Sequence, residues 1–255
     1  MVKLSVNVNK VATLRNSRGG QVPSVTKAVK TCLSAGAHGI TVHPRADERH
    51  IRRSDVAEIA AEIRSFVSRT GNRVEFNIEG DPRPDLIDLA LENRPDQCTL
   101  VPVTPGEITS HAGWPATTPR DALGVVIGRL QSAGVRVSLF VDPDAAAVEW
   151  AARMGAERIE LYTEPFARAM LESQAAGAAS YERYAEAARL AHTRGLGINA
   201  GHDLDLDNLP MFRNLPHLAE VSIGHALVSR ALWVGLDRVV REYREVLAGT
   251  TDGPV

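Results

Sequence analysis

The sequence has few of the features that mark a secreted, membrane-spanning or metal-binding chain. It holds two cysteines, Cys32 and Cys98, and no CxxC pair, so a disulfide framework or a cysteine-based zinc site is not expected. No apolar run approaches the roughly 18 residues of a membrane span, and the first four residues lack a signal-peptide pattern. These absences predict a cytoplasmic protein in which both thiols are buried and inert.

An excess of charge of one sign is missing as well. The chain carries 29 Lys and Arg against 31 Asp and Glu, a net charge of −2, which gives no general attraction for nucleic acid or a membrane surface. Any anionic ligand must therefore be held by a local cluster. No Pro/Ser-rich linker or shift in composition divides the chain. We expect a single domain over residues 1–255, with residues 249–255 as a frayed tail.

What the sequence does contain is a recurring order of helical pattern, glycine and apolar strand. Glycines suited to a left-handed helix C-cap precede several of the strands, at Gly36, Gly71, Gly134, Gly155 and Gly195. Eight strands are expected, over residues 4–8, 39–42, 74–78, 97–101, 137–141, 158–161, 196–199 and 219–223. Strands that alternate with helices indicate a parallel sheet, and eight such units predict an α/β fold, a (β/α)8 TIM barrel with additional helices.

Two connections are longer than a barrel requires. Residues 103–119 hold three prolines and two glycines and show no helical pattern in their first part, which is typical of a functional loop or lid, although an ordered surface excursion is the alternative. Residues 166–194 predict one short and one long helix with a break near Gly177. We expect these extra helices to pack against other subunits.

Ionisable residues lie on or directly after four of the expected strands. The strands carry or lead to His43, Glu79, Glu160 and His202, and a barrel brings these ends to the rim where its active sites lie. Carboxylates and imidazoles in a desolvated pocket are suited to proton transfer. Satisfied core groups are the alternative. A metal site that includes His225 is another, but no HxH or HExxH spacing supports it.

Two places in the sequence could hold anions. Gly224 and His225 open a helix directly after the eighth strand, where free backbone N–H groups favour phosphate; a plain turn is the alternative. The second place is a basic cluster around the first two strand ends, whose guanidinium groups match phosphate, although a solvated face is equally consistent. Its members are Arg15, Arg18, Arg45 and His50.

A glycine pattern near the seventh strand resembles a dinucleotide-binding fingerprint. Gly195, Gly197 and Ala200 fit the G-x-G-x-x-A form. That fingerprint must follow a strand and open a helix, whereas this one runs into a strand. We therefore expect no nicotinamide site here.

Several blocks of the chain resemble the pyridoxine 5'-phosphate synthase family, which closes the ring in vitamin B6 biosynthesis. The blocks are residues 6–19, 39–45, 49–51, 76–79, 137–140, 199–202 and 223–226. The resemblance implies a barrel with additional helices that assembles as a homo-oligomer, an octamer. It implies condensation of 3-amino-2-oxopropyl phosphate with 1-deoxy-D-xylulose 5-phosphate to pyridoxine 5'-phosphate, phosphate and water, with no cofactor and no metal.

The resemblance also implies roles for individual residues. His43 and Glu79 would accept protons, His202 would donate one, and Glu160 would stabilise a transition state. The aminoketone phosphate would be held by Asn7, Arg18, Asp203, Gly224 and His225. The sugar phosphate would be held by Asn9, Lys10, Arg45, His50 and Thr109.

The chain departs from some members of that family at three of these positions. Those members have Asp-His where this chain has Asn9-Lys10, which replaces an ionisable pair by a neutral amide and a fixed cation. They have Gly where this chain has Asp203, whose carboxylate would repel phosphate, so only its backbone N–H is suited to an anion.

Two other functions are compatible with the same residues. A Lys-dependent aldolase would form a Schiff base on Lys10. A non-catalytic sensor of phosphorylated metabolites would bind both ligands without needing Glu79 or His202.

Overall fold

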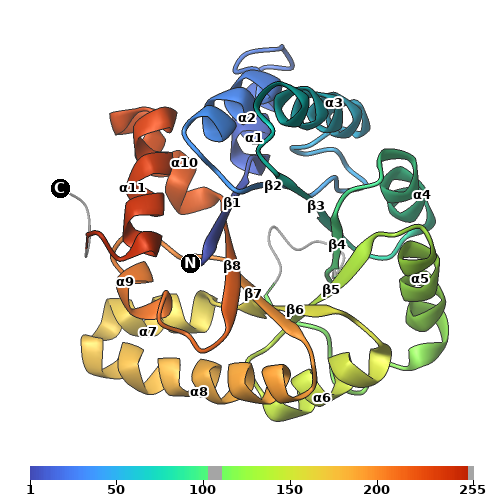
Figure 1. Ribbon diagram of the computed structural model, residues 1–255, viewed down its shortest axis with the longest axis vertical. Coiled ribbons are helices and arrows are strands. Elements are labelled where there is room, and N and C mark those ends of the chain that lie inside the picture. Colours follow the sequence, from blue (N-terminus) through green and yellow to red (C-terminus); the bar gives the residue numbers. More distant parts are fainter. Residues whose placement is uncertain (103–110, 252–255) are drawn as a thin grey trace.

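Eight parallel strands close into a barrel in the computed structural model, which describes residues 1–102 and 111–251 (Figure 1). The strands are β1 (Lys3–Asn7), β2 (Gly39–Val42), β3 (Glu75–Gly80), β4 (Gln97–Leu100), β5 (Arg136–Val141), β6 (Arg158–Tyr162), β7 (Gly197–Gly201) and β8 (Leu218–Ile223). Each strand pairs with the next, and β8 pairs with β1. The predicted (β/α)8 barrel is therefore confirmed.

Helices surround the barrel on its outside (Figure 1). They are α1 (Asn9–Asn16), α2 (Val25–Ser34), α3 (Arg53–Thr70), α4 (Pro84–Asn93), α5 (Arg120–Ser132), α6 (Ala145–Met154), α7 (Glu164–Glu172), α8 (Gln174–Thr193), α9 (Leu209–Phe212), α10 (His225–Val234) and α11 (Leu236–Ala248). Where two helices follow one strand, as after β1, β6 and β8, the fold carries the predicted additional helices. Within the described residues, none of the helices combines the length and apolar character needed to cross a membrane.

The glycines predicted to end helices adopt the expected conformation. Gly36, Gly71, Gly134, Gly155 and Gly195 all have positive φ angles, between 71° and 97°. L-residues with a side chain rarely adopt this region. The turns that precede the strands were therefore correctly placed from the sequence. The dinucleotide-like pattern ends inside β7, so it does not form a strand-to-helix turn.

The long connection between β6 and β7 breaks at Ser173, and the predicted break near Gly177 is wrong. Ser173 caps α8 by accepting a hydrogen bond from the Ala176 backbone N–H at 3.1 Å. Gly177 lies inside α8, and a Cβ atom there would lie 2.1 Å from Sδ of Met170 on α7. The glycine therefore allows α7 and α8 to pack closely.

The inner wall of the barrel is polar. Along each strand, apolar residues alternate with polar ones, as in Leu4, Ser5 and Val6, and the apolar residues belong to the core between strands and helices. Barrel interiors are more often filled by layers of Val, Ile and Leu. The buried polar residues on the strands are Ser5, Thr41, Glu75, Asn77, Glu79, Gln97, Thr99, Ser138, Glu160, Asn199, Glu220 and Ser222.

These polar side chains bind one another across neighbouring strands. Ser5 and Thr41 hydroxyls lie 2.7 Å apart, and Thr99 donates to Asn77 Oδ1 at 3.1 Å. Nearer the amino ends of the strands, Arg136 forms an ion pair with Glu75 and donates to Gln97 at 3.1 Å. Since buried polar groups are costly unless they are hydrogen-bonded, these contacts permit a polar interior.

The described part of the connection between β4 and α5 is fixed to the barrel by Trp114. Its indole Nε1 donates to the Leu100 carbonyl at 2.9 Å, and its backbone N–H donates to the Phe140 carbonyl at 2.9 Å. Its ring stacks on Trp150 of α6 at 6.2 Å between centroids. The predicted loop or lid begins with residues 103–110, which lie outside the described residues.

The residues after α11 return to the body of the barrel. Arg213 donates from Nη1 to the carbonyls of Val246 and Thr251 at 2.7 and 2.9 Å. Thr250 donates its backbone N–H to Glu245 at 3.1 Å. The remainder of the expected tail, residues 252–255, lies outside the described residues.

We expect Gly113→Ala to destabilise the protein, because a Cβ atom at this position would lie 2.4 Å from the Asp142 backbone nitrogen and 2.4 Å from the Val141 Cα. Backbone atoms cannot move aside easily, so the free energy of unfolding should fall by about 1–3 kcal/mol. Urea denaturation followed by tryptophan fluorescence measures the change.

Gly128→Ala in α5 is the matched control, since a Cβ atom there meets nothing within 4 Å. Alanine should leave stability unchanged or raise it by about 0.5–1 kcal/mol in a helix. Equal stabilities of the two variants would contradict the close approach at Gly113.

Candidate active site

A cavity of about 470 Å³ lies at the carboxyl ends of the strands. Its walls come from most of the barrel strands and from the helices α1 and α10 that follow β1 and β8. The lining residues are Asn7, Asn9, Lys10, Thr13, His43, Arg45, Arg49, His50, Glu79, Val101, Phe140, Glu160, His202, Asp203, Ser222, Gly224 and His225. The four residues expected to carry proton transfer, His43, Glu79, Glu160 and His202, are all among them.

Two of the residues implied by resemblance are not placed in the cavity. Arg18 is exposed beyond the end of α1 and does not line it. Thr109 lies outside the described residues. In contrast, Phe140 and Ser222 line the cavity although the sequence analysis did not single them out. Side chains alternate between the inside and the outside along β5 and β8, and this period would have indicated that Phe140 and Ser222 face the inside of the barrel.

A chain of amide contacts links the first strand to the candidate acid–base groups. Asn7 Nδ2 donates to Glu79 Oε2 at 3.4 Å, and Asn7 Oδ1 accepts the backbone N–H of Asn9 at 3.0 Å. Asn9 Oδ1 in turn accepts the backbone N–H of His43 at 2.9 Å. The two asparagines thus orient Glu79 and the turn that carries His43.

Two of the carboxyls that line the cavity, Glu79 and Glu160, have raised pKa values. Burial raises the pKa of Glu79 well above the usual range of a carboxyl, and the charges of Glu160 and Glu220 raise it further. Burial also raises the pKa of Glu160 to about 7, although His202 and a hydrogen bond from Thr99 act in the opposite direction. A carboxyl with a pKa of about 7, such as Glu160, can both hold and release a proton near neutral pH.

The two imidazoles that follow β2 are held neutral. Burial lowers the pKa of His43 to about 3, assisted by the neighbouring His50 and by the positive charges of Arg45 and Arg83. Burial, Arg45 and Lys10 lower the pKa of His50 to about 4. Among the described residues, Nε2 of His43 is buried and has no hydrogen-bond partner.

Two glycines leave room for polar side chains at the rim. A Cβ atom at Gly201 would lie 2.3 Å from Glu160 Oε1, and one at Gly224 would lie 3.1 Å from Asn7 Cβ. Gly224 is also the residue before α10, which begins at His225 as predicted. The first N–H groups of α10 therefore lie beside the cavity, where they are suited to an anion.

The chain is similar to known proteins over nearly its whole length. The family model described as "Pyridoxal phosphate biosynthesis protein PdxJ" matches residues 4–249. The pyridoxine 5'-phosphate synthase of Bacteroides fragilis is 53% identical over 97% of this chain and 100% of its own length. The synthase of Leptospira biflexa is 48% identical over 97% and 98%.

The chain belongs to the PdxJ family. A solved structure of phosphoribosylanthranilate isomerase from Thermotoga maritima has a TM-score of 0.58 at 12% identity, covering 98% of this chain and 100% of that one. This second likeness shows the barrel fold alone.

The cavity of this PdxJ family member does not form a recognisable metal centre. Across residues 1–102 and 111–251, no group of three or more His, Cys, Asp or Glu side chains is arranged to hold a metal ion. The alternative metal site built from His43, Glu79, His202 and His225 is therefore not formed by the described residues.

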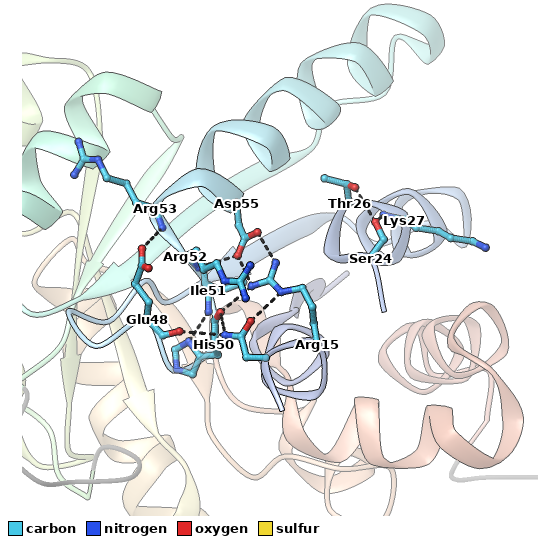
Figure 2. Close-up of polar contacts among 11 residues, drawn as sticks. Arg15, Ser24, Thr26, Lys27, Glu48, His50, Ile51, Arg52, Arg53 and Asp55 are labelled. Atoms are coloured by element: carbon cyan, nitrogen blue, oxygen red, sulfur yellow. Dashed lines mark hydrogen bonds and ion pairs between the residues drawn. The ribbon is translucent and has the colours of Figure 1, made fainter. Parts of the chain in front are cut away.

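Arg15 is not part of the anion site, and that prediction is wrong. Arg15 Nη1 and Nη2 donate to the two carboxylate oxygens of Asp55 at 2.5 and 2.9 Å, with exposed side-chain fractions of 3% and 7% (Figure 2). Nη2 also donates to the His50 carbonyl at 3.1 Å, and Asn16 Nδ2 donates to the same oxygen at 2.7 Å. Arg15 therefore fixes the loop that carries His50.

We expect Arg15→Leu to lower the free energy of unfolding by about 3–5 kcal/mol, because it leaves the buried carboxylate of Asp55 without its partner. Urea denaturation measures this loss.

Arg241→Leu is the control, since the Arg241–Asp237 pair on α11 is more than half exposed at both ends. Surface pairs contribute little, so this change should alter stability by less than about 1 kcal/mol. A similar small effect for Arg15→Leu would show that the buried pair does not fix the loop.

Proposed function

We propose that this chain is a pyridoxine 5'-phosphate synthase. It condenses 3-amino-2-oxopropyl phosphate with 1-deoxy-D-xylulose 5-phosphate to give pyridoxine 5'-phosphate, phosphate and water. The observation that carries the proposal is the meeting of Glu79, Glu160, His43 and His202 in one cavity, in a chain about half identical to relatives named for this activity. Imine formation, dehydration and ring closure all require proton transfers, which these groups can supply.

Two phosphorylated substrates need two anion sites. The N-terminus of α10 with Gly224 and His225 is one candidate, which we assign to the aminoketone phosphate together with Asn7 and Asp203. Arg18 belongs to the same assignment by resemblance alone. Lys10, Arg45 and His50, which follow β1 and β2, are the second candidate, assigned to the sugar phosphate with Asn9 and Thr109.

The resemblance to the family supports the following proton-transfer roles. His43 and Glu79 accept protons, His202 donates one, and Glu160 stabilises the transition state. Binding of the sugar phosphate would favour this role of His43, because the phosphate charge would offset the Arg45 guanidinium, which adds to the effect of burial in lowering the pKa of His43. Substrate binding would thereby make His43 a stronger base when it is needed.

We further propose that the protein works without a cofactor, resides in the cytoplasm and assembles as a homo-octamer. The overall condensation is redox-neutral, so it needs no nicotinamide. Large apolar side chains exposed on the additional helices support assembly: Leu171 on α7 is 87% exposed and Trp233 on α10 is 87% exposed.

Incubating the purified protein with both substrates should give the pyridoxine phosphate chromophore and release phosphate, without added metal or nucleotide. Absence of product from authentic substrates would reject the proposal. If borohydride instead trapped a substrate covalently on Lys10, a Lys-dependent aldolase would be favoured.

Glu79→Gln should lower kcat by about 10²- to 10⁴-fold while leaving KM for both substrates nearly unchanged, because the amide fills the same space but cannot accept a proton. Steady-state kinetics separate the two parameters. The matched control is Glu58→Gln, the same chemical change at an exposed position on α3, which should retain full activity. An increase in KM alone would remove Glu79 from the proton-accepting role.

A further inference from the structure

The turn after β7 has an unusual backbone. His202 and Asp203 follow the strand directly, and both have positive φ angles, 85° and 59°. Such angles are uncommon for residues other than glycine and persist where the surroundings hold them. Thr163 donates its hydroxyl to the carbonyls of Gly201 and His202, and Asn208 Nδ2 donates to the Asp203 carbonyl at 3.1 Å.

This turn brings two consecutive side chains into contact. On a regular strand, neighbouring side chains point to opposite faces. Here, however, Nδ1 of His202 lies 2.8 Å from Oδ2 of Asp203. The other side of the imidazole packs against the ring of Tyr162 in an edge-on geometry, with centroids 5.2 Å apart. The His202 ring is thus fixed between a carboxylate and an aromatic wall.

We propose that Asp203 is a positioning residue for the reaction, which orients His202 and fixes its tautomer. An ionised carboxylate can only accept hydrogen bonds, so Nδ1 of the neutral imidazole must carry the hydrogen. Nε2 is then the atom that takes up and releases the proton, and the carboxylate stabilises the imidazolium in between. The proposal rests on the proposed function, in which His202 donates a proton to the substrate.

The charges around Asp203 keep it ionised. The hydrogen bond with His202 lowers the pKa of Asp203 against the opposing effect of partial burial, and His225 and Lys10 lower it further. Some members of the family have His at the position of Lys10 and Gly at the position of Asp203. The cation and the anion that this chain carries at these two positions lie close enough to interact. Glu160 faces His202 from β6, and Asp142, Glu164 and Arg168 line a neighbouring hollow with both residues.

This role differs from that of a substrate-binding residue. A side chain that holds phosphate affects KM, whereas one that orients a proton donor affects kcat. The Asp203 carboxylate would repel a phosphate, so its removal should not raise KM. The side chain is 39% exposed, which limits the size of the effect compared with a fully buried pair.

Kinetic measurement of Asp203→Asn tests the inference. We expect kcat to fall by roughly 10- to 100-fold, with KM for either substrate unchanged or lower. Asp207→Asn is the matched control, because Asp207 is exposed on the same loop and loses the same charge. Its kcat should stay within about twofold of the parent protein. Should Asp203→Asn fail to fold, Asp203→Gly replaces it, since glycine adopts a φ of 59° without strain.

The tautomer of His202 provides a second readout, independent of activity. In unliganded protein labelled with ¹⁵N-histidine, the neutral ring should carry its hydrogen on Nδ1, with His202→Gln identifying the resonance. Asp203→Gly should shift the population towards Nε2–H. A parent protein with Nε2–H, an unchanged kcat in Asp203→Asn, or a rise in KM alone would each overturn the inference. If the parent protein lacks synthase activity, the proposed function fails, while the tautomer still decides whether the pair exists.

Discussion

The strands of this barrel alternate between outward apolar and mostly polar inward side chains, and both the core and the cavity depend on that alternation. Leu4, Ile40 and Ile78 fill the layer between strands and helices, while Ser5, Thr41 and Asn77 face the opposite way and bind their neighbours. Because these inner groups are hydrogen-bonded to each other, carboxyls can be placed among them without contact with bulk water. The polar groups of the cavity therefore continue the polar inner wall of the barrel below them.

Burial of these carboxyls opposes stability while it prepares them for catalysis. Glu160 titrates near pH 7 in the folded chain but near the ordinary carboxyl range when unfolded. The folded protein therefore binds this proton more tightly than the unfolded one, and the resulting stabilisation is lost as pH rises through about 7. The fold compensates through contacts such as the buried Arg15–Asp55 pair and the aliphatic outer layer.

Much of this arrangement can be predicted from the sequence, because it depends on local patterns. Strand–helix alternation and the glycine C-caps give the barrel, and the barrel brings His43 and Glu79 together. The ion-pair partner of a charged residue cannot be predicted in the same way. In the sequence, Arg15 does not differ from the basic residues around it, and only the structure shows that it pairs with Asp55 on α3. The contact between His202 and Asp203 was equally hidden, since it depends on two positive φ angles that a non-glycine sequence does not indicate.

The floor of the barrel is electrostatically connected to its rim through Glu220. Among the described residues, this glutamate on β8 has one carboxylate oxygen that is buried without a hydrogen-bond partner. Burial and the charge of Glu75 raise its pKa, and the charge of Glu220 adds to the burial that raises the pKa of Glu79. Glu75 in turn is paired with Arg136. Replacing the polar residues at the floor of the barrel by aliphatic ones is an obvious way to make the barrel more resistant to heat. Such a replacement would therefore also change the pKa of Glu79, although no residue that lines the cavity would be altered.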